Sequence, residues 1–208
     1  MNAPDAEIGP DGRPLLAADG TVLGVVRPTR VSDAEAYRDL IRASFRADPE
    51  SRRWFVAAEA DLDTVLAHIA GNLSFVLDDG GRLLASCSAR MPWSPNPAPF
   101  AFPHLSWITS HPDQQGRGLG RLITDAVVAH LGAALKAPAV SLGTAREHAF
   151  LVAHYARLGW RPFEDRDLGL GHITRYFIRV LDPDAVRARG ARLGLSAEIV
   201  EELTATNA

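Results

Sequence analysis

The chain has 208 residues, of which 47% are hydrophobic and 23% are charged, and its formal net charge is −3. This length suits one globular domain, and the apolar fraction excludes a wholly disordered chain. The negative charge argues against a general nucleic-acid binder, so no nucleic-acid partner is expected. Cys87 is the only cysteine, which excludes an intrachain disulfide and a Cys-x-x-Cys zinc site.

Hydropathy along the chain gives no sign of a membrane segment. No stretch of about 18 apolar residues occurs, which is the length that a membrane-spanning helix needs. The first ten residues carry acids, and they lack the basic and apolar regions of a secretory signal. We therefore expect a cytoplasmic protein without a membrane partner.

The first half of the chain predicts an N-terminal arm followed by mixed elements. Residues 1–24 are rich in Gly, Pro, Asp and Ala, and we interpret them as an arm with at most a short strand near residues 21–26. Ser32 is expected to cap a helix, because apolar residues then recur at helical spacing. The elements expected here are a strand over 23–28, a helix over 33–45, a helix over 62–70 ending at Gly71, and a β-hairpin with strands at 75–77 and 82–91.

The second half begins with an irregular segment, since residues 92–103 hold five prolines. The expected elements after it are strands over 105–110, 140–142, 160–163 and 172–181, helices from 119 to 131 and over 147–158, and one or two helices in 184–203. A hairpin sheet followed by strand–helix–strand units predicts an α/β fold. Its central sheet is mixed and mostly antiparallel, with helices on both sides in three layers.

The most informative segment joins a strand to a helix through Gly116, Gly118 and Gly120. Glycines let backbone amides approach a ligand without Cβ interference, and a helix N-terminus adds unpaired N–H donors. Together they form an anion site, typically for phosphate. Arg117 and Arg121 add positive charge. No lysine follows as in the Walker pattern, and Arg121 stands where the dinucleotide pattern GxGxxG needs its third glycine.

The spacing Gln115-x-x-Gly118-x-Gly120 resembles the acyl-CoA motif of the GNAT superfamily, the acetyl-CoA-dependent N-acyltransferases. A second match lies downstream, where Tyr155-x-x-x-Gly159-Trp160 resembles the family's Tyr-x-x-x-Gly-Phe segment with tryptophan in place of phenylalanine. The resemblance covers residues 25–181. It leaves the N-terminal arm, 1–24, and a C-terminal helical extension, 182–208, outside the predicted GNAT domain.

The resemblance implies that acetyl-CoA or CoA binds as a cosubstrate between two parallel strands, here 105–110 and 139–144. No spacing of His, Asp or Glu residues predicts a metal site, so no metal is expected. The glycine turn would hold the pyrophosphate, and strand main chain would pair with the pantetheine arm. An amide of Ile108 or Thr109 would stabilise the oxyanion. His148 stands where the family often has an asparagine that contacts the cofactor. The predicted cofactor-binding residues are Ile108, Thr109, Ser110, Gln115, Gly116, Arg117, Gly118, Leu119, Gly120, Arg121 and His148.

Two residues are predicted to be catalytic. Tyr155 matches the family tyrosine that protonates the departing thiolate, and a phenol of pKa about 10 can supply a proton to a thiolate whose conjugate acid lies near about 8.5. Many relatives place a glutamate base on the strand before the glycine turn, but this strand has none. The nearby candidates are His104, Ser106 and, across the turn, His111. His104 lies at the start of the strand and titrates in the useful range, so it is the candidate general base. A base from another element, such as Glu59 or Asp61, stays open.

The sequence favours an enzyme that transfers an acetyl group from acetyl-CoA to a primary amine by direct attack within a ternary complex. The alternative is a non-catalytic GNAT-like acyl-CoA-binding module with a role in regulation or assembly. A nucleotide-phosphate-binding protein of another fold is a third, weaker hypothesis. The sequence leaves open whether the acceptor is a small-molecule amine or a protein amine. It also leaves open the acyl chain and the oligomeric state, a homodimer included.

Overall fold

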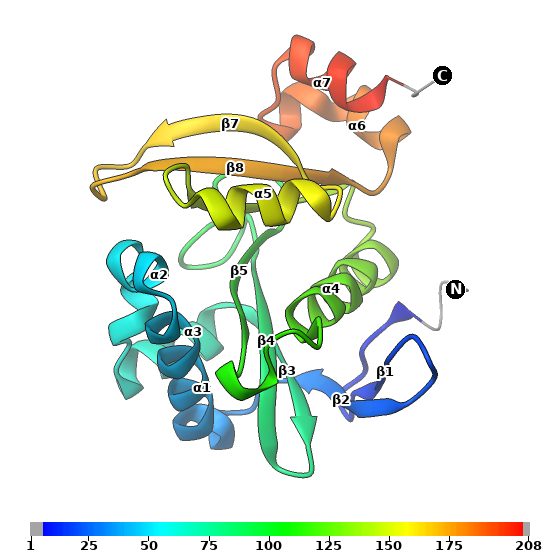
Figure 1. Cartoon of the computed structure of the whole chain (residues 1–208). Helices are drawn as coiled ribbons and strands as arrows, with labels where there is room; N and C mark the ends of the chain where they lie inside the picture. The colour runs from blue at the N-terminus through cyan, green and yellow to red at the C-terminus, as the bar shows by residue number, and fades with distance from the viewer. Residues whose placement is uncertain (1–5, 206–208) are drawn as a thin grey trace. The chain divides into compact units, whose positions relative to one another are not determined.

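The computed structural model describes residues 6–205, except for the side chains of residues 52–54 and 56. Figure 1 shows the helices and the strands of one sheet, whose order is β1-β2-β3-β4-β5-β6-β8-β7. β5 and β6 pair in parallel, whereas the five other pairs described are antiparallel. This is the mixed, mostly antiparallel sheet that the sequence predicts. The strands are β1 (Arg13–Leu16), β2 (Val22–Pro28), β3 (Leu73–Asp79), β4 (Arg82–Arg90), β5 (His104–Ser110), β6 (Ala139–Ala145), β7 (Arg161–Asp167) and β8 (Ile173–Val180).

Most helices begin where a short polar side chain accepts a hydrogen bond from the first turn. Asp61 accepts from the amide of Thr64 at 2.8 Å, and Asp182 accepts from the amide of Ala185 at 2.9 Å. Such caps satisfy amides that have no partner inside the helix. The helices are α1 (Ala34–Ala47), α2 (Pro49–Trp54), α3 (Leu62–Gly71), α4 (Leu119–Leu135), α5 (Ala149–Arg157), α6 (Pro183–Arg189) and α7 (Ala197–Thr204), with 3₁₀ turns η2 (Val31–Asp33), η3 (Val56–Glu59), η4 (Pro112–Gln114) and η5 (Gly190–Leu193).

The first of two compact units comprises residues 1–89 and 106–130. Its antiparallel strands β1 to β4 run in sequence order, with Val26 opposite Leu77 and Phe75 opposite Cys87. Apolar side chains of α1, α3 and β3 form its core, where Tyr37 and Val65 are fully buried. Burial raises the pKa of the Cys87 thiol to about 12, so this cysteine packs as a thiol.

An ionic network fastens β2 of this unit to the start of α1. Arg27 donates to both carboxylate oxygens of Asp33, at 2.7 and 3.0 Å, and its Nε donates to Asp78 at 2.9 Å. The other carboxylate oxygen of Asp78 accepts from the amide of Gly81 at 2.7 Å, which closes the β3–β4 hairpin turn. The Arg27 side chain is only 8% exposed, so these contacts operate with little solvent screening.

The second unit comprises residues 90–105 and 131–208. β6 pairs with β8, and β7 lies at the edge beside β8. The C-terminal helical extension packs into the core of this unit, where Val186 and Leu193 are buried in one cluster with Phe102 and Ile178. Helices α6 and α7 and the turn η5 thus lie in this segment, and their apolar side chains complete this core.

Most expected elements are confirmed, and three details differ. Residues 13–16 form strand β1 inside the predicted arm; Pro14 lies in this edge strand, where a missing N–H is tolerated. Ser32 was expected to cap α1, but it lies inside η2, and Asp33 occupies the N-cap position. Helix α2 was not expected, because six residues are too few for an apolar period to show.

Candidate active site

The glycine turn lies at the end of β5, in the first unit. The strand leads through η4 into Gln115–Gly118, which are exposed, and Leu119 begins α4. Leu119 is 1% exposed, so its side chain anchors the turn to the protein interior. The sequence therefore predicts correctly a strand, an exposed glycine turn and a long helix in this order.

The turn leaves room for a ligand above its amides. Gly116 and Gly118 have φ of +80° and +71°, and a Cβ added at either position would meet no heavy atom within 4 Å. Among the described residues their amides donate to no backbone carbonyl, whereas those of Gln115 and Arg117 donate within the turn, at 3.3 and 3.4 Å. Free amides beside the N-terminus of a 17-residue helix fit an anionic ligand such as a pyrophosphate.

Two arginines contribute positive charge at the turn. Arg117 donates to the neutral side-chain carbonyl of Gln114, so its charge is not compensated by that contact. Arg121 lies 3.4 Å from Asp125 one helical turn further on, and its side chain is 60% exposed. Exposed pairs of this kind contribute little to stability, which leaves both side chains able to reorient toward a ligand.

A set of polar contacts holds the start of the turn against β4. The amide of His111 donates to the carbonyl of Leu84 at 2.8 Å. The imidazole Nδ1 of His111 lies 2.7 Å from Oδ1 of Asp113. Asp113 also pairs with Arg82, and this hydrogen bond from Arg82 is the main reason why the pKa of Asp113 falls to about 2. His111 is therefore engaged in bracing the turn.

Strand β5 carries a distortion just before the predicted oxyanion amides. Trp107 has φ of +47°, a left-handed conformation that a bulky residue rarely adopts. Its carbonyl accepts from Ser86 Oγ at 2.8 Å, and the same hydroxyl lies 2.8 Å from Thr109 Oγ1. Such distortions concentrate at functional sites and persist only where neighbours hold them. Thr109 is 4% exposed, whereas Ile108 and Ser110 are half-buried.

Tyr155 lies on α5 in the second unit, and its side chain is half-buried. Its ring centroid lies 5.8 Å from that of Phe177 on β8. Gly159 has φ of +79° and lets the chain turn back, so that the amide of Trp160 donates to the carbonyl of Tyr155 at 3.1 Å. The residues of the Tyr-x-x-x-Gly-Trp segment thus form the C-terminal end of α5, and this contact fixes the position of Tyr155 on the helix.

His148, one of the predicted cofactor contacts, caps the N-terminus of α5. Its Nδ1 accepts from the amide of Leu151 at 3.4 Å, and the residue is 1% exposed. Asparagine is a favoured N-cap residue, so histidine here can do the capping that an asparagine would do. Its contact with the cofactor stays a prediction.

The surroundings of His104 do not favour it as a general base. It is 8% exposed, and its Nδ1 lies 2.9 Å from Ser141 Oγ. Burial and, second, the positive charge of Arg90 lower its pKa to about 3. An imidazole of that pKa is a weak proton acceptor at neutral pH, because catalytic bases work best with a pKa near the working pH. The prediction from strand position missed this, since it rested on the pKa of an exposed histidine.

The alternative carboxylate bases also have structural partners. Glu59 pairs with Arg46, and Asp61 caps α3. The contact with the amide and side chain of Thr64 lowers the pKa of Asp61, which makes it a weaker base. Neither geometry favours proton abstraction from an amine.

Sequence reasoning did not single out Arg90 and Arg166, which lie in the second unit beside Tyr176 and Phe100. One signal was available for Arg90. It ends β4 directly after Leu83–Ala89, a run of seven residues with no charge that are all buried. A charged residue at the end of a buried strand is a candidate for a functional role.

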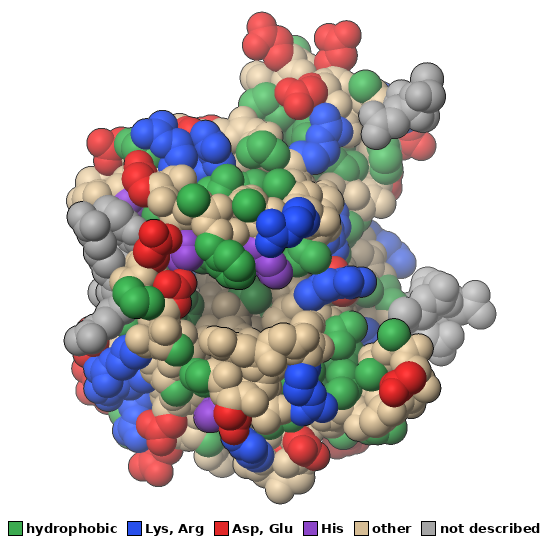
Figure 2. Space-filling view, viewed as in Figure 1, with side chains coloured by type: hydrophobic (Ala, Val, Ile, Leu, Met, Phe, Trp, Pro, Cys, Tyr) green, Lys and Arg blue, Asp and Glu red, His purple; other side chains and the backbone are tan. Residues whose placement is uncertain are grey.

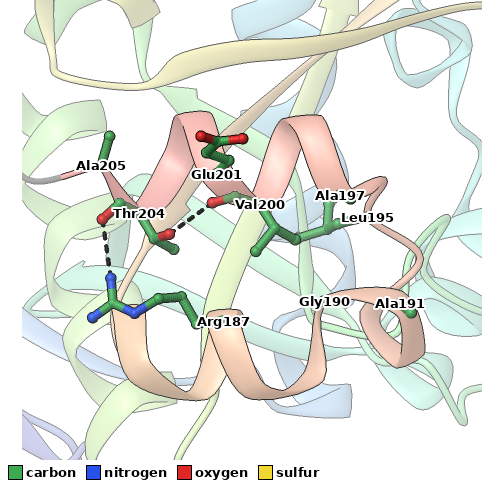
Figure 3. Close-up of a pocket in the computed structure, with 9 residues that line it drawn as sticks. All are labelled: Arg187, Gly190, Ala191, Leu195, Ala197, Val200, Glu201, Thr204 and Ala205. Atoms are coloured by element: carbon green, nitrogen blue, oxygen red, sulfur yellow. Dashed lines mark hydrogen bonds between the residues drawn. The ribbon is translucent and has the colours of Figure 1, made fainter.

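A cavity of about 630 Å³ lies in the C-terminal extension, between α6 and α7 (Figure 3). Arg187 spans it and donates to the carbonyl of Thr204 at 3.0 Å. The lining of this cavity includes none of the predicted site residues. Residues 6–205 contain no group of three or more His, Cys, Asp or Glu side chains that could hold a metal.

The same described part of the chain has no helix with the length and apolar character needed to cross a membrane. On the face seen in Figure 2, acidic and basic side chains are interspersed, in line with the small net charge.

Comparison with known proteins decides the family. Residues 27–160 match the Acetyltransferase (GNAT) family. The chain belongs to the GNAT acetyltransferase family. It is 38% identical over 153 residues to the S-(2-succino)cysteine N-acetyltransferase of Bacillus subtilis (strain 168). This match covers 73% of this chain and 93% of that protein. It is 30% identical over 152 residues to the S-alkylcysteine N-acetyltransferase of the same organism. This second match covers 70% of this chain and 85% of that protein.

A solved structure agrees with this GNAT fold. The N-acetyltransferase from Thermoplasma acidophilum in complex with coenzyme A has a TM-score of 0.56 and 15% identity, and the match covers 74% of this chain and 97% of that one. The family and the named relatives make this GNAT protein an acetyltransferase, so they favour an enzyme over the non-catalytic binding module.

Proposed function

We propose that this GNAT protein transfers an acetyl group from acetyl-CoA to the α-amino group of a small S-substituted cysteine. The observation that carries the proposal is the 38% identity, over 93% of its length, to an S-(2-succino)cysteine N-acetyltransferase. A second relative of 30% identity is named for S-alkylcysteine. Both names share a cysteine whose sulfur is substituted and whose amine accepts the acetyl group.

The turn residues would hold acetyl-CoA by its phosphates. The free amides of Gly116 and Gly118, the N-terminus of α4 and the guanidinium groups of Arg117 and Arg121 together suit a pyrophosphate. The main chain of Ile108–Ser110 would pair with the pantetheine arm. When bound, acetyl-CoA supplies a thioester, whose acyl carbon accepts an amine nucleophile.

Two groups of the chain would assist the transfer. A backbone amide of Ile108 or Thr109 donates a hydrogen bond to the acyl oxygen as negative charge develops there. The hydroxyl of Tyr155 gives its proton to the leaving sulfur, since the phenol is protonated at neutral pH.

The amine must reach the reaction in its neutral form. Because His104 is buried and its pKa is lowered to about 3, we propose that the ammonium proton passes to water rather than to this imidazole. The value of kcat/KM should then rise with pH up to the pKa of the amine itself. Its pH profile should show no inflection near the ordinary histidine value of about 6.5.

A thiol-release assay over a panel of amines tests the proposed function. We expect turnover of S-(2-succino)cysteine and S-alkylcysteines, and much less with lysine, spermidine or a peptide N-terminus. Acetyl-CoA and CoA should each raise the melting temperature by mass action. No thermal shift at millimolar CoA would refute the acyl-CoA site, and turnover confined to the other amines would refute the acceptor class.

A further inference from the structure

Among the described residues, Arg90 has no carboxylate as a counter-ion. Its Nη2 donates to the carbonyl of Pro97 at 2.8 Å. Its Nε is buried and has no hydrogen-bond partner among those residues. Burial lowers the pKa of this guanidinium, in the direction that disfavours its charged form. A buried donor without an acceptor destabilises a fold, so such a group calls for a ligand that accepts from it.

A second guanidinium lies against the same aromatic side chains. The Arg166 guanidinium carbon is 4.6 Å from the ring centroid of Phe100 and 5.4 Å from that of Tyr176. Burial raises the pKa of Tyr176, while the positive charges of Arg166 and Arg90 oppose that rise. Both arginines therefore act on the same phenol. Arg166 also pairs with Glu164, which holds its side chain in place.

Tyr176 and the two arginines beside it lie on the face of β8 opposite to α5. Phe177 contacts Tyr155 of α5, and successive strand residues point to opposite faces, so Tyr176 points away from α5. On that side its ring meets His104, at 5.7 Å between centroids, and Phe100. An imidazole carries no negative charge in either protonation state, so His104 does not offset the charge of Arg90, which itself lowers the pKa of His104.

We propose that Arg90 and Arg166 form a subsite that binds a carboxylate of the acceptor. This inference rests on the proposed function and deepens it. Guanidinium groups bind carboxylates through paired N–H donors, and the free Nε of Arg90 is one such donor. An S-(2-succino)cysteine carries carboxylates on its succinyl and cysteine parts, whereas an S-alkylcysteine has only the cysteine carboxylate. The ligand class is a small amine that bears at least one carboxylate.

The subsite is tested with Arg90→Gln, Arg90→Lys and Arg166→Gln. The control is Arg192→Gln, which removes an exposed arginine of η5 in the same unit. Equal melting temperatures would show that the variants fold. One readout is calorimetric titration with succinate and with S-(2-succino)cysteine, which needs no turnover. The other is kcat/KM for S-(2-succino)cysteine and S-propylcysteine at saturating acetyl-CoA.

Arg90→Gln and Arg166→Gln should each weaken the binding of S-(2-succino)cysteine by about 10- to 10²-fold, as expected for loss of a hydrogen bond to a charged group. Arg90→Lys should recover part of the loss, because the charge returns without the fork geometry. A loss confined to succinate and the succinyl substrate assigns the subsite to the succinyl carboxylates. An equal loss with S-propylcysteine assigns it to the cysteine carboxylate.

Two results would overturn the subsite: wild-type protein that binds neither titrant, or arginine variants that bind both as tightly as the Arg192→Gln control. Failure of the proposed function has a different signature. In that case the wild-type protein binds the carboxylates and loses this binding in the variants, yet it acetylates no S-substituted cysteine.

Discussion

Ser86 Oγ donates a 2.8 Å hydrogen bond to the carbonyl of Trp107, the residue of β5 whose φ is +47°. The indole stacks flat on His68, with 3.6 Å between ring centroids and 2° between planes. Left-handed backbone at a bulky residue costs about 1–3 kcal/mol, so contacts like these are needed to hold it. The distortion immediately precedes Ile108 and Thr109, and we assign the amide of one of these two residues to the acyl oxygen.

Ser86→Ala should therefore impair the use of acetyl-CoA more than it impairs folding. Removing the hydroxyl leaves a carbonyl unpaired, at a cost of about 1–3 kcal/mol, and frees the strand to relax. We expect KM for acetyl-CoA to rise several-fold, measured by saturation kinetics. Ser88→Ala is the control, since Ser88 is buried on the same strand but bonds to Tyr37 and Ser74. Equal KM values in the two variants would contradict a role for the Trp107 conformation.

Gly118→Val should abolish tight binding of CoA. Valine is strained at φ of +71°, and its branched side chain would occupy the open space above the amides. The matched control is Gly20→Val in the β1–β2 turn, where φ is +86° and the space is equally open. Both variants should lose similar stability, and only the first should lose the CoA-dependent rise in melting temperature. An unchanged rise in folded Gly118→Val would refute the phosphate assignment.

Tyr155→Phe keeps the ring contact with Phe177 and removes the hydroxyl. If that hydroxyl protonates the leaving sulfur, kcat should fall by about 10²-fold, within the usual range for acid catalysis. The affinity for CoA should change little, because the proton transfer occurs in the transition state. Single-turnover thiol release and calorimetric titration measure the two quantities. Full activity would leave Tyr155 a packing role only.

Arg27→Met should strongly destabilise the first unit. The change leaves Asp33 and Asp78 without their cation while both are mostly buried, with side chains 14% and 19% exposed. Breaking a buried pair in this way costs about 3–5 kcal/mol. The urea midpoint should fall with the m-value unchanged. A shift no larger than that of Arg38→Met, whose partner Asp39 is 68% exposed, would contradict a structural role for the network.

The sequence alone was sufficient to predict structural features that depend on residues close together in the chain. The glycine turn, the helix that follows it and the end of α5 at Gly159 were predicted, because positive φ and helix ends demand particular residues locally. The left-handed Trp107 was not predicted, since the residues that hold it come from distant segments. The state of His104 was missed for the same reason: its pKa depends on its burial and on the charge of Arg90, and both arise only in the folded protein.

The buried neutral His104 should make the protein sensitive to mild acid. Its folded pKa is about 3, below the unfolded value of about 6.5, so between these values the unfolded chain binds more protons. The free energy of unfolding therefore rises with pH across this window, and the contribution of His104 is lost as pH falls from about 6.5 toward 3. One such group contributes up to about 1.4 kcal/mol per pH unit.

His104→Gln removes this titration and can keep a hydrogen bond to Ser141, the 2.9 Å partner of the imidazole. Urea unfolding at pH 5, 6 and 7 should show a smaller loss of stability on acidification in the variant than in the wild type. Its kcat at pH 7 should stay within several-fold of the wild-type value, because the imidazole is not the proposed base. A large loss of kcat, together with loss of an inflection in the pH profile, would restore His104 as the base. Equal acid sensitivity of the two proteins would show that the imidazole titrates normally in the fold.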